Sequence, residues 1–296
     1  YAYLKISEGC DRKCSFCAIP LMRGGHKSTP IEDLVTESEK LSSKGVKELI
    51  LIAQDLTYYG LDLYKERKLS ELMTKLSEVE GIEWIRIHYA FPTAFPENVL
   101  EVIRTNPKVC TYMDIPLQHV SDNLLSSMRR GTTMQKTKDL ITKFRKEVPG
   151  ITIRTSLIVG YPGETEKEFQ ELLDFLTEAQ LDRVGCFAYS PVKGAVANDL
   201  PDSVPEELKE DRLARFMAHQ ADISAARLQQ RVGRVEQVLI DEVVEEGAVA
   251  RSKADAPEID GQVFIDGATH LKVGDLVNVE IEEVDEYDMW GRLVDV

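Results

Sequence analysis

A regular alternation of short apolar runs with amphipathic stretches is the feature that most constrains the fold of this chain. The apolar runs have the length of buried strands and lie at residues 3–7, 48–53, 84–89, 112–115, 151–159 and 184–190. Helical patterns follow at residues 31–43, 69–79, 96–105, 121–128, 134–148 and 166–179. Six successive βα units predict parallel strands with right-handed crossovers, in either a barrel or a doubly wound sheet.

Two helix starts carry recognisable end signals. The sequence Thr29-Pro30-Ile31-Glu32 combines a capping-box pattern with proline at the first helical position, and Thr165 followed by Glu168 repeats the box. Both signals are structural, and we assign no chemistry to them.

Three cysteines, Cys10, Cys14 and Cys17, lie in one short loop directly after the first predicted strand. Soft thiolate ligands select zinc, copper(I) or an iron-sulfur cluster. A structural zinc site needs a fourth ligand; His26 is near enough in sequence to be considered, but no second pair of cysteines or histidines follows it. The spacing favours a four-iron cluster with one open iron, with zinc ligation or unrelated thiols as the alternatives.

Composition narrows the class of protein. With 296 residues, 43% of them apolar, the chain suits one large domain or two unequal ones. No apolar run approaches the ~20 residues of a membrane span, so we expect a soluble, cytoplasmic protein without membrane contact. Cys110 and Cys186 stand alone in apolar strand-like sequence, where a free cysteine is usually a small buried hydrophobe.

Polar residues follow several predicted strands at their carboxyl ends. Gln54 and Asp55 follow the second strand, Gln118 and His119 the fourth, and residues 160–164 the fifth. In β/α barrels the reacting groups come from the loops at this face, which is also where the cysteine loop lies. We therefore expect these residues to point toward the cysteines.

The cysteine loop and its continuation, Ala18 to Gly24, together with residues 158–165, resemble the methylthiotransferase branch of the radical S-adenosylmethionine (SAM) superfamily. The resemblance implies an α/β fold, a partial (β/α)6 TIM-like barrel of the radical SAM type. It also implies one 4Fe-4S cluster on Cys10, Cys14 and Cys17 as the catalytic and metal-binding residues. The open iron of this cluster binds SAM, and reductive cleavage of SAM yields a 5'-deoxyadenosyl radical.

The same resemblance assigns cofactor-binding roles to further positions. Arg130 pairs with the SAM carboxylate, while Gln118 and Ser156 hydrogen-bond the ribose or carboxylate. The remaining predicted contacts are Phe16 beside the adenine, Gln54 near the amino group, and Gly160, whose backbone approaches the adenine. Without the resemblance, we would interpret these residues as packing residues of a loop, as turn residues or as a surface cation.

After residue 228 the pattern changes to short alternating strands with turns at Asp260-Gly261, Asp266-Gly267 and Gly274-Asp275. This part resembles a TRAM domain, a small antiparallel β-barrel usually regarded as an RNA-binding module. We therefore expect a radical SAM core at residues 1–228 and a TRAM barrel at 229–296. The barrel holds 17 acidic and six basic residues, so most of the net charge of −15 lies there. Such a surface repels phosphates and attracts a basic protein.

Two motifs indicate which branch the chain resembles. It reads Ala53-Gln54-Asp55 where the tRNA-modifying branch normally has Gly-Gln-Asn, and Asp114 to His119 follows the fourth strand. Both resemble the RimO branch, which methylthiolates the β-carbon of an aspartate on the twelfth protein of the small ribosomal subunit. The predicted partners are that basic ribosomal protein, bound through the acidic TRAM domain, and an external electron donor; tRNA is a less favoured partner.

Two alternatives stay open at this point: a tRNA (adenosine) methylthiotransferase, and a non-catalytic binding module with structural zinc. Full-length members of the resembled family carry a second 4Fe-4S cluster in a further amino-terminal domain. Cys110 and Cys186 cannot supply three thiolates, so we expect that domain to be missing and this chain to retain only the SAM-cleaving core.

Overall fold

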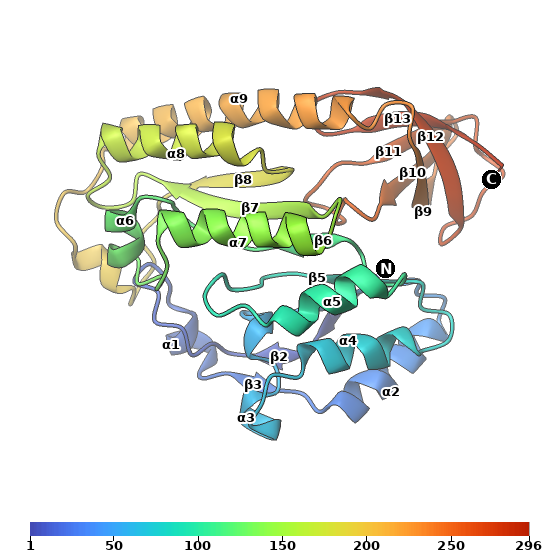
Figure 1. The fold of residues 1–296 in the computed structure, drawn as a ribbon, viewed down its shortest axis with the longest axis horizontal. Coiled ribbons are helices and arrows are strands. Elements are labelled where there is room, and N and C mark those ends of the chain that lie inside the picture. Colours follow the sequence, from blue (N-terminus) through green and yellow to red (C-terminus); the bar gives the residue numbers. More distant parts are fainter. Residues whose placement is uncertain (296) are drawn as a thin grey trace.

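The computed structural model describes residues 1–295, and an arc of six parallel strands forms its larger part (Figure 1). Three strands pair in the order β1-β4-β5 and three in the order β6-β7-β8, all parallel. The two sheets meet where Ile85 forms a parallel bridge with Val109. The strands are β1 (Ala2–Lys5), β4 (Glu48–Ile52), β5 (Trp84–Ile87), β6 (Tyr112–Asp114), β7 (Thr152–Val159) and β8 (Arg183–Ala188).

Helices cross between these strands, as the sequence predicts. They are α2 (Ile31–Ser42), α4 (Leu69–Ser77), α5 (Glu97–Thr105), α6 (Asp122–Ser127), α7 (Met134–Glu147) and α8 (Glu166–Ala179). The apolar sides of α2, α4, α5, α7 and α8 share one core with the outward side of the sheet, whereas Leu124 of α6 belongs to a smaller cluster with Tyr161 and Tyr189. The β1 and β8 edges do not pair with each other, so the barrel is partial and the predicted fold class is confirmed.

The two predicted helix starts differ in outcome. The capping box at Thr165 is present, with Glu168 bonding back to the Thr165 amide. The box predicted at Thr29 is wrong, because Pro30 is itself the cap residue of α2 and no side chain caps the helix. The backbone of Thr29 is bonded to Ile6, and the Ile31 amide donates instead to the Tyr64 hydroxyl at 3.0 Å.

Short elements that the sequence pattern does not predict fill the loops. They are β2 (Ser7–Glu8), α1 (Ile19–Arg23), β3 (Lys27–Ser28), η1 (Leu56–Tyr58), α3 (Leu61–Tyr64) and η2 (Val196–Asp199). The third strand also ends earlier than predicted, at Ile87, and Tyr89 beyond it adopts a φ of 67°.

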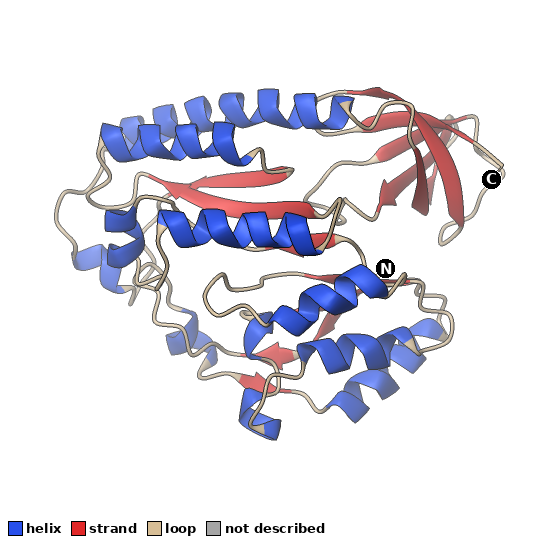
Figure 2. Ribbon diagram, viewed as in Figure 1, coloured by secondary structure: helices blue, strands red, loops and turns tan. Residues whose placement is uncertain are grey.

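A second unit follows the long helix α9 (Glu206–Gln229), which packs along β8 and α8. It is a closed barrel of five strands in the order β10-β11-β13-β12-β9 (Figure 2). These are β9 (Val235–Val243), β10 (Gly247–Ser252), β11 (Val263–Asp266), β12 (Leu276–Val284) and β13 (Met289–Leu293). Alternate residues of these strands fill a separate core, to which Leu228 at the end of α9 also contributes.

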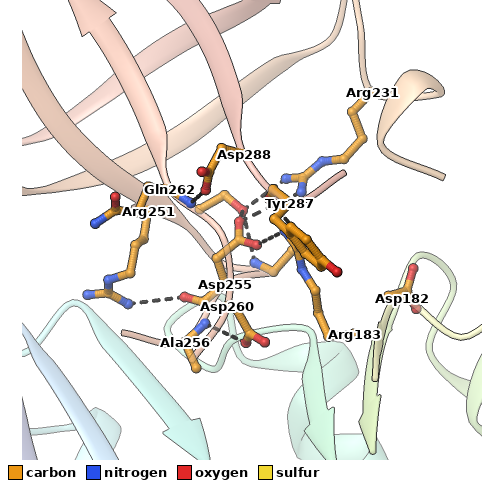
Figure 3. Close-up of polar contacts among 12 residues, drawn as sticks. Asp182, Arg183, Arg231, Arg251, Asp255, Ala256, Asp260, Gln262, Tyr287 and Asp288 are labelled. Atoms are coloured by element: carbon orange, nitrogen blue, oxygen red, sulfur yellow. Dashed lines mark hydrogen bonds and ion pairs between the residues drawn. The ribbon is translucent and has the colours of Figure 1, made fainter. Parts of the chain in front are cut away.

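The closed barrel packs against the amino ends of the parallel strands (Figure 1). Arg86 of β5 donates to the Lys253 carbonyl at 2.8 Å, and the Tyr112 hydroxyl at the start of β6 donates to Asp260 at 2.6 Å. Arg183 at the start of β8 donates to Asp255 (Figure 3). The segment between β10 and β11 therefore closes the amino end of the strand arc, opposite the cysteine loop. No helix in residues 1–295 is both long and apolar enough to span a membrane.

Candidate active site

The cysteine loop is closed by a tight backbone contact. Gly9 has a φ of 77°, and a Cβ on it would lie 2.2 Å from the Gly25 carbonyl oxygen. The Cys10 amide donates to the Gly24 carbonyl at 3.1 Å, and β2 pairs with β3 just outside this contact. Only glycine fits at position 9, because any side chain would force the two ends of the loop apart.

Two side chains anchor the loop to neighbouring strand ends. The Ser15 hydroxyl donates to the Ser127 carbonyl at 2.8 Å and lies 2.8 Å from the Tyr161 hydroxyl. Arg12 Nε donates to Asp55 Oδ2 at 2.9 Å, and its guanidinium lies 3.8 Å from the centre of the Phe91 ring. The loop is thus fixed to the segments that follow β4, β5, α6 and β7.

The three thiols face the interior of the strand arc. Burial raises the pKa of Cys10 and of Cys17, and Arg130 Nη1 lies 3.3 Å from Cys14 Sγ. Within residues 1–295, no three His, Cys, Asp or Glu side chains converge closely enough to ligate one metal ion. A four-iron cluster does not need the three thiolates to meet at one metal ion, because each thiolate binds its own iron.

His26 does not face the thiols as a fourth ligand would. Its Nε2 lies 3.1 Å from the Ser28 hydroxyl and 4.0 Å from Asp62, and the lining of the cavity beside the cysteines does not include His26. The atoms of this loop that can ligate a metal and that face the cavity are therefore the three cysteine sulfur atoms.

A cavity of about 650 Å³ lies beside the cysteines. Its lining includes eight of the nine site residues predicted from the sequence: Cys10, Cys14, Phe16, Cys17, Gln54, Gln118, Arg130 and Ser156. The cysteine loop, the segments after β4 and β6 and the strand β7 supply seven of them, in agreement with the barrel rule. Arg130 comes from the segment after α6. The volume falls within the usual range for ligand sites of about 300–1,000 Å³.

Two buried polar atoms on this lining, Gln54 Oε1 and Arg130 Nε, have no hydrogen-bond partner within residues 1–295. Arg130 also donates to the Pro116 carbonyl at 2.5 Å, which fixes its guanidinium at the cavity wall. A buried donor or acceptor without a partner costs about 1–3 kcal/mol. An ammonium group at Gln54 and a carboxylate at Arg130 would satisfy both atoms, so the residues present fit an amino acid ligand such as the methionine part of SAM.

Gln118 is held in an uncommon backbone conformation, with a φ of 74°. Its amide donates to the Ser156 carbonyl at 2.9 Å, and the Ile158 amide donates back to the Gln118 carbonyl at 2.7 Å. This exchange extends the pairing of β6 with β7 beyond Asp114 and brings Gln118 beside Ser156. Strain of this kind concentrates at ligand sites.

The β7 strand shows why Ser156 faces the cavity. Ile153, Leu157 and Val159 are fully buried against the helices, whereas Arg154, Ser156 and Ile158 point to the other side and line the cavity. This is the alternation expected of a strand between a core and a cavity.

Gly160 is the one predicted site residue that the structure does not bring to the cavity. It has a φ of 72°, its amide donates to Glu164, and a Cβ on it would lie 2.3 Å from Lys209 Cγ in α9. Gly160 packs outward because the chain turns toward α9 as soon as β7 ends.

His119 and Glu164 also lie outside the cavity, in contrast to what their positions after the strands suggest. His119 Nδ1 accepts from the Ser121 amide at 3.0 Å, so the proton is on Nε2, which donates to Glu164 at 3.1 Å. The other Glu164 oxygen accepts from Arg212 at 2.8 Å. These buried residues tie the strand ends to α9.

Sequence reasoning missed most of the remaining cavity residues, and it named Tyr89 and Phe91 only as aromatic side chains able to line the barrel mouth, with plain packing as the alternative. The lining also includes Arg12, Tyr89, Phe91, Arg154, Phe187 and Ile259. Tyr89 and Phe91 follow β5, and Phe187 lies within the last residues of β8, so the same barrel rule points to all three. The alternation along β7 could have found Arg154. Ile259 belongs to the closed barrel, and no local pattern indicates that it would reach the core.

Comparison with protein families agrees with this geometry. The model of the "Radical SAM superfamily" matches residues 4–176, and that of the "TRAM domain" matches residues 232–294. The first match contains the cysteine loop and the ends of β4 to β7, and the second spans the closed barrel.

Solved structures support the fold. The chain is similar to coproporphyrinogen III oxidase (HemN) from Escherichia coli, a radical SAM enzyme, with a TM-score of 0.57 and 16% identity over 85% of this chain and 64% of that one. The radical SAM methyltransferase TsrM from Kitasatospora setae gives 0.52 and 18%, over 63% and 36% of the two chains.

Relatives with known names are much closer in sequence. "Ribosomal protein uS12 methylthiotransferase RimO" of Christiangramia forsetii is 58% identical over 297 residues, which cover 100% of this chain and 66% of the relative. The protein of the same name in Flavobacterium johnsoniae is 56% identical, over 99% and 67%. The chain spans about two thirds of the length of these relatives. It belongs to the radical SAM superfamily and, within it, to the RimO family of ribosomal protein uS12 methylthiotransferases.

Proposed function

We propose that this chain is the SAM-cleaving core of a methylthiotransferase that modifies the β-carbon of an aspartate on ribosomal protein uS12. The observation that carries the proposal is one cavity that combines three cysteine thiols with two unpartnered polar atoms, at Gln54 and Arg130. The relatives named RimO favour this function over a tRNA methylthiotransferase and over a zinc-containing binding module.

In the proposed mechanism, Cys10, Cys14 and Cys17 hold the 4Fe-4S cluster. When bound, a reduced cluster would supply one electron to the carbon-sulfur bond of SAM, which would give methionine and a 5'-deoxyadenosyl radical able to take hydrogen from an unactivated carbon. The chain's own residues bind, orient and shield these groups.

Each lining residue has a defined task in this proposal. Arg130 pairs with the SAM carboxylate, and Gln54 accepts from the amino group. Gln118 and Ser156 hydrogen-bond the ribose or the carboxylate, and Phe16 packs beside the adenine. For Gly160 we propose a structural role in place of an adenine contact, since it faces Lys209.

In this proposal the target protein reaches the cavity through an opening beside the unpaired β1 and β8 edges. Phe187 of β8 and Ile259 of the closed barrel both line the cavity, yet they are 59% and 46% exposed. The rim of the cavity therefore reaches from the strand arc to the acidic barrel. A basic protein bound to that barrel is held where an aspartate side chain can enter the cavity, which supports uS12 over tRNA as the partner.

The domain organisation that we propose follows from the same packing. Residues 1–228 form the radical SAM core and 229–296 the TRAM barrel, with the boundary at the end of α9, where Leu228 already packs in the barrel core. Cys110 lies just before β6 and Cys186 lies in β8, and residues 1–295 hold no second group of three thiols. A second cluster and the sulfur that it carries therefore belong to another part of the full enzyme, and the reducing electron to an external donor. Modification of a ribosomal protein implies a cytoplasmic reaction.

The decisive experiment is anaerobic reconstitution with iron and sulfide, reduction with dithionite in the presence of SAM, and chromatographic detection of 5'-deoxyadenosine. We expect the product with the wild-type protein and with Cys186→Ala, whose thiol lies in β8, and its loss with Cys14→Ala. Four bound irons without any 5'-deoxyadenosine would contradict the proposal. For the partner, tight and salt-sensitive tRNA binding with no binding of uS12 would favour the tRNA alternative.

A further inference from the structure

A second cavity, of about 720 Å³, lies at the other end of the strand arc, where β7 and β8 begin and the closed barrel packs. It shares no lining residue with the cavity beside the cysteines. Six cations line it: Arg145, Arg183, Arg227, Arg231, Arg234 and Lys253. We call this set the basic cavity. Its concentration of positive charge stands out in a chain with a net charge of −15.

Three of the six cations are neutralised by carboxylates. Arg227 Nε donates to Asp182 at 2.7 Å, and Arg231 Nε donates to Glu236 at 2.7 Å. Arg183 donates to Asp255, which also lies 3.7 Å from Arg231 (Figure 3). These pairs hold the guanidinium groups in place at the cavity wall.

The other three cations form no salt bridge with any carboxylate of residues 1–295. Arg145 donates to the Gln180 carbonyl at 2.7 Å, and Lys253 donates to the Pro107 carbonyl at 2.6 Å. The exposed Arg234 side chain makes no hydrogen bond within the same residues. Within residues 1–295 the cavity thus keeps about three positive charges that no salt bridge neutralises, although Asp182 lies near enough to Arg145 to act on its charge.

We propose that the basic cavity binds a small phosphorylated ligand of about nucleotide size. Arginine forks match phosphate oxygens in charge and geometry, and a concave site concentrates the field of its cations. The volume leaves room for more than a single phosphate. A long nucleic acid is disfavoured, because strands beyond the cavity would run along the acidic barrel and be repelled.

The partial burial of Arg145, like the excess of positive charge, favours binding of an anion in the basic cavity. Burial and the nearby Arg227 both lower the pKa of Arg145. An anion bound between these two side chains relieves their mutual repulsion, so ligand binding is expected to stabilise the junction between the strand arc and the closed barrel.

The test is titration calorimetry of the purified protein with inorganic pyrophosphate at low salt, repeated with saturating SAM. We expect saturable binding that SAM does not displace. The double variant Arg145→Gln, Lys253→Gln is expected to weaken pyrophosphate binding at least tenfold, and Arg234→Gln, which removes an exposed side chain without contacts, at least threefold. Arg104→Gln, an exposed arginine of α5 outside the cavity, serves as the matched control and leaves binding unchanged.

Three results would overturn the proposal: no binding of pyrophosphate, equal binding by all variants, or displacement by SAM, which would assign the anion to the cavity beside the cysteines. Tighter, variant-sensitive binding of a short single-stranded RNA would replace the small ligand with a nucleic acid. The readout is binding alone, so it stands independently of whether the protein cleaves SAM.

Discussion

Arg251 of the closed barrel donates a hydrogen bond of 2.7 Å to Glu48 at the start of β4, and neither side chain reaches solvent. The second Glu48 oxygen accepts from Arg86 of β5, also at 2.7 Å. One carboxylate therefore serves two buried guanidinium groups, one from each unit. This contact fixes the barrel against the amino end of the strand arc.

Replacing this carboxylate is expected to be costly. Glu48→Gln leaves Arg86 buried without a paired carboxylate, while Arg251 keeps Asp241, and breaking a buried pair in this way costs about 3–5 kcal/mol. Urea unfolding monitored by circular dichroism measures the change. The matched control is Glu78→Gln, which removes the exposed partner of Lys75 and is expected to cost less than about 1 kcal/mol. Equal effects of the two substitutions would contradict the structural role of Glu48.

The Glu48 carboxylate also affects how the free energy of unfolding changes at low pH. Burial raises the pKa of Glu48, but Arg86 and Arg251 more than offset this, so its pKa is lowered overall. Its stabilisation is present above the unfolded pKa of about 4.3 and is lost as the pH falls through the lower folded value. Below about pH 4 the free energy of unfolding should therefore fall less steeply in Glu48→Gln than in the wild type.

His88 predicts a second loss of stability on acidification, which begins at a higher pH than the loss from Glu48. Burial and the nearby Arg86 lower its pKa to about 3, and its Nε2 has no partner. Because the unfolded histidine titrates near 6.5, the unfolded state binds more protons between these values, and stability falls as the pH drops below about 6.5. His88→Phe keeps a ring against Tyr112 and removes this dependence, on the order of 3 kcal/mol by pH 4. Parallel stability curves for the two proteins from pH 7 to 4 would contradict the assignment.

The strand arc was predictable from the sequence because each of its elements has a local cause. The apolar run at β4 and the periodic helix α8, with its Thr165 cap, need no distant partner to be recognised. The short elements around the cysteine loop have no such cause. Helix α1 buries none of its residues, and β2 and β3 exist because Gly9 and Gly25 bring the two ends of the loop together.

The residues of the candidate site also include some that the sequence predicts and some that it does not. Gln54 and Gln118 could be predicted because they follow strands whose carboxyl ends share one face. Gly160 follows β7 equally closely and yet turns away, because Lys209 of α9 approaches it from outside. The position of Ile259 depends on how the closed barrel packs on the arc, and that packing depends on buried ion pairs between residues far apart in the sequence.

A substitution at Gly160 can distinguish a contact with the adenine of SAM from a purely structural role against Lys209. Gly160→Ala introduces a Cβ in a left-handed conformation and against the buried Lys209 side chain, so we expect a loss of about 1–3 kcal/mol in unfolding free energy. The affinity for SAM should stay within twofold. Gly163→Ala is the matched control, because it has a φ of 86° but open space around the added atom, and it should cost less. A large loss of SAM affinity in Gly160→Ala without loss of stability would restore the adenine contact.

Gln54 makes the most direct prediction for the cavity. Its buried Oε1 has no partner in the protein alone, so a ligand ammonium group gains a hydrogen bond that costs the protein no existing one. Gln54→Leu keeps the shape and removes the acceptor, which is expected to weaken SAM binding about tenfold, or roughly 1.4 kcal/mol. Calorimetry on the reconstituted protein measures the affinity, and unchanged iron content shows that the cluster is intact. Gln170→Leu, an exposed glutamine of α8, should bind SAM like the wild type. If Gln54→Leu also did so, the amino group of SAM would have to bind elsewhere on the lining.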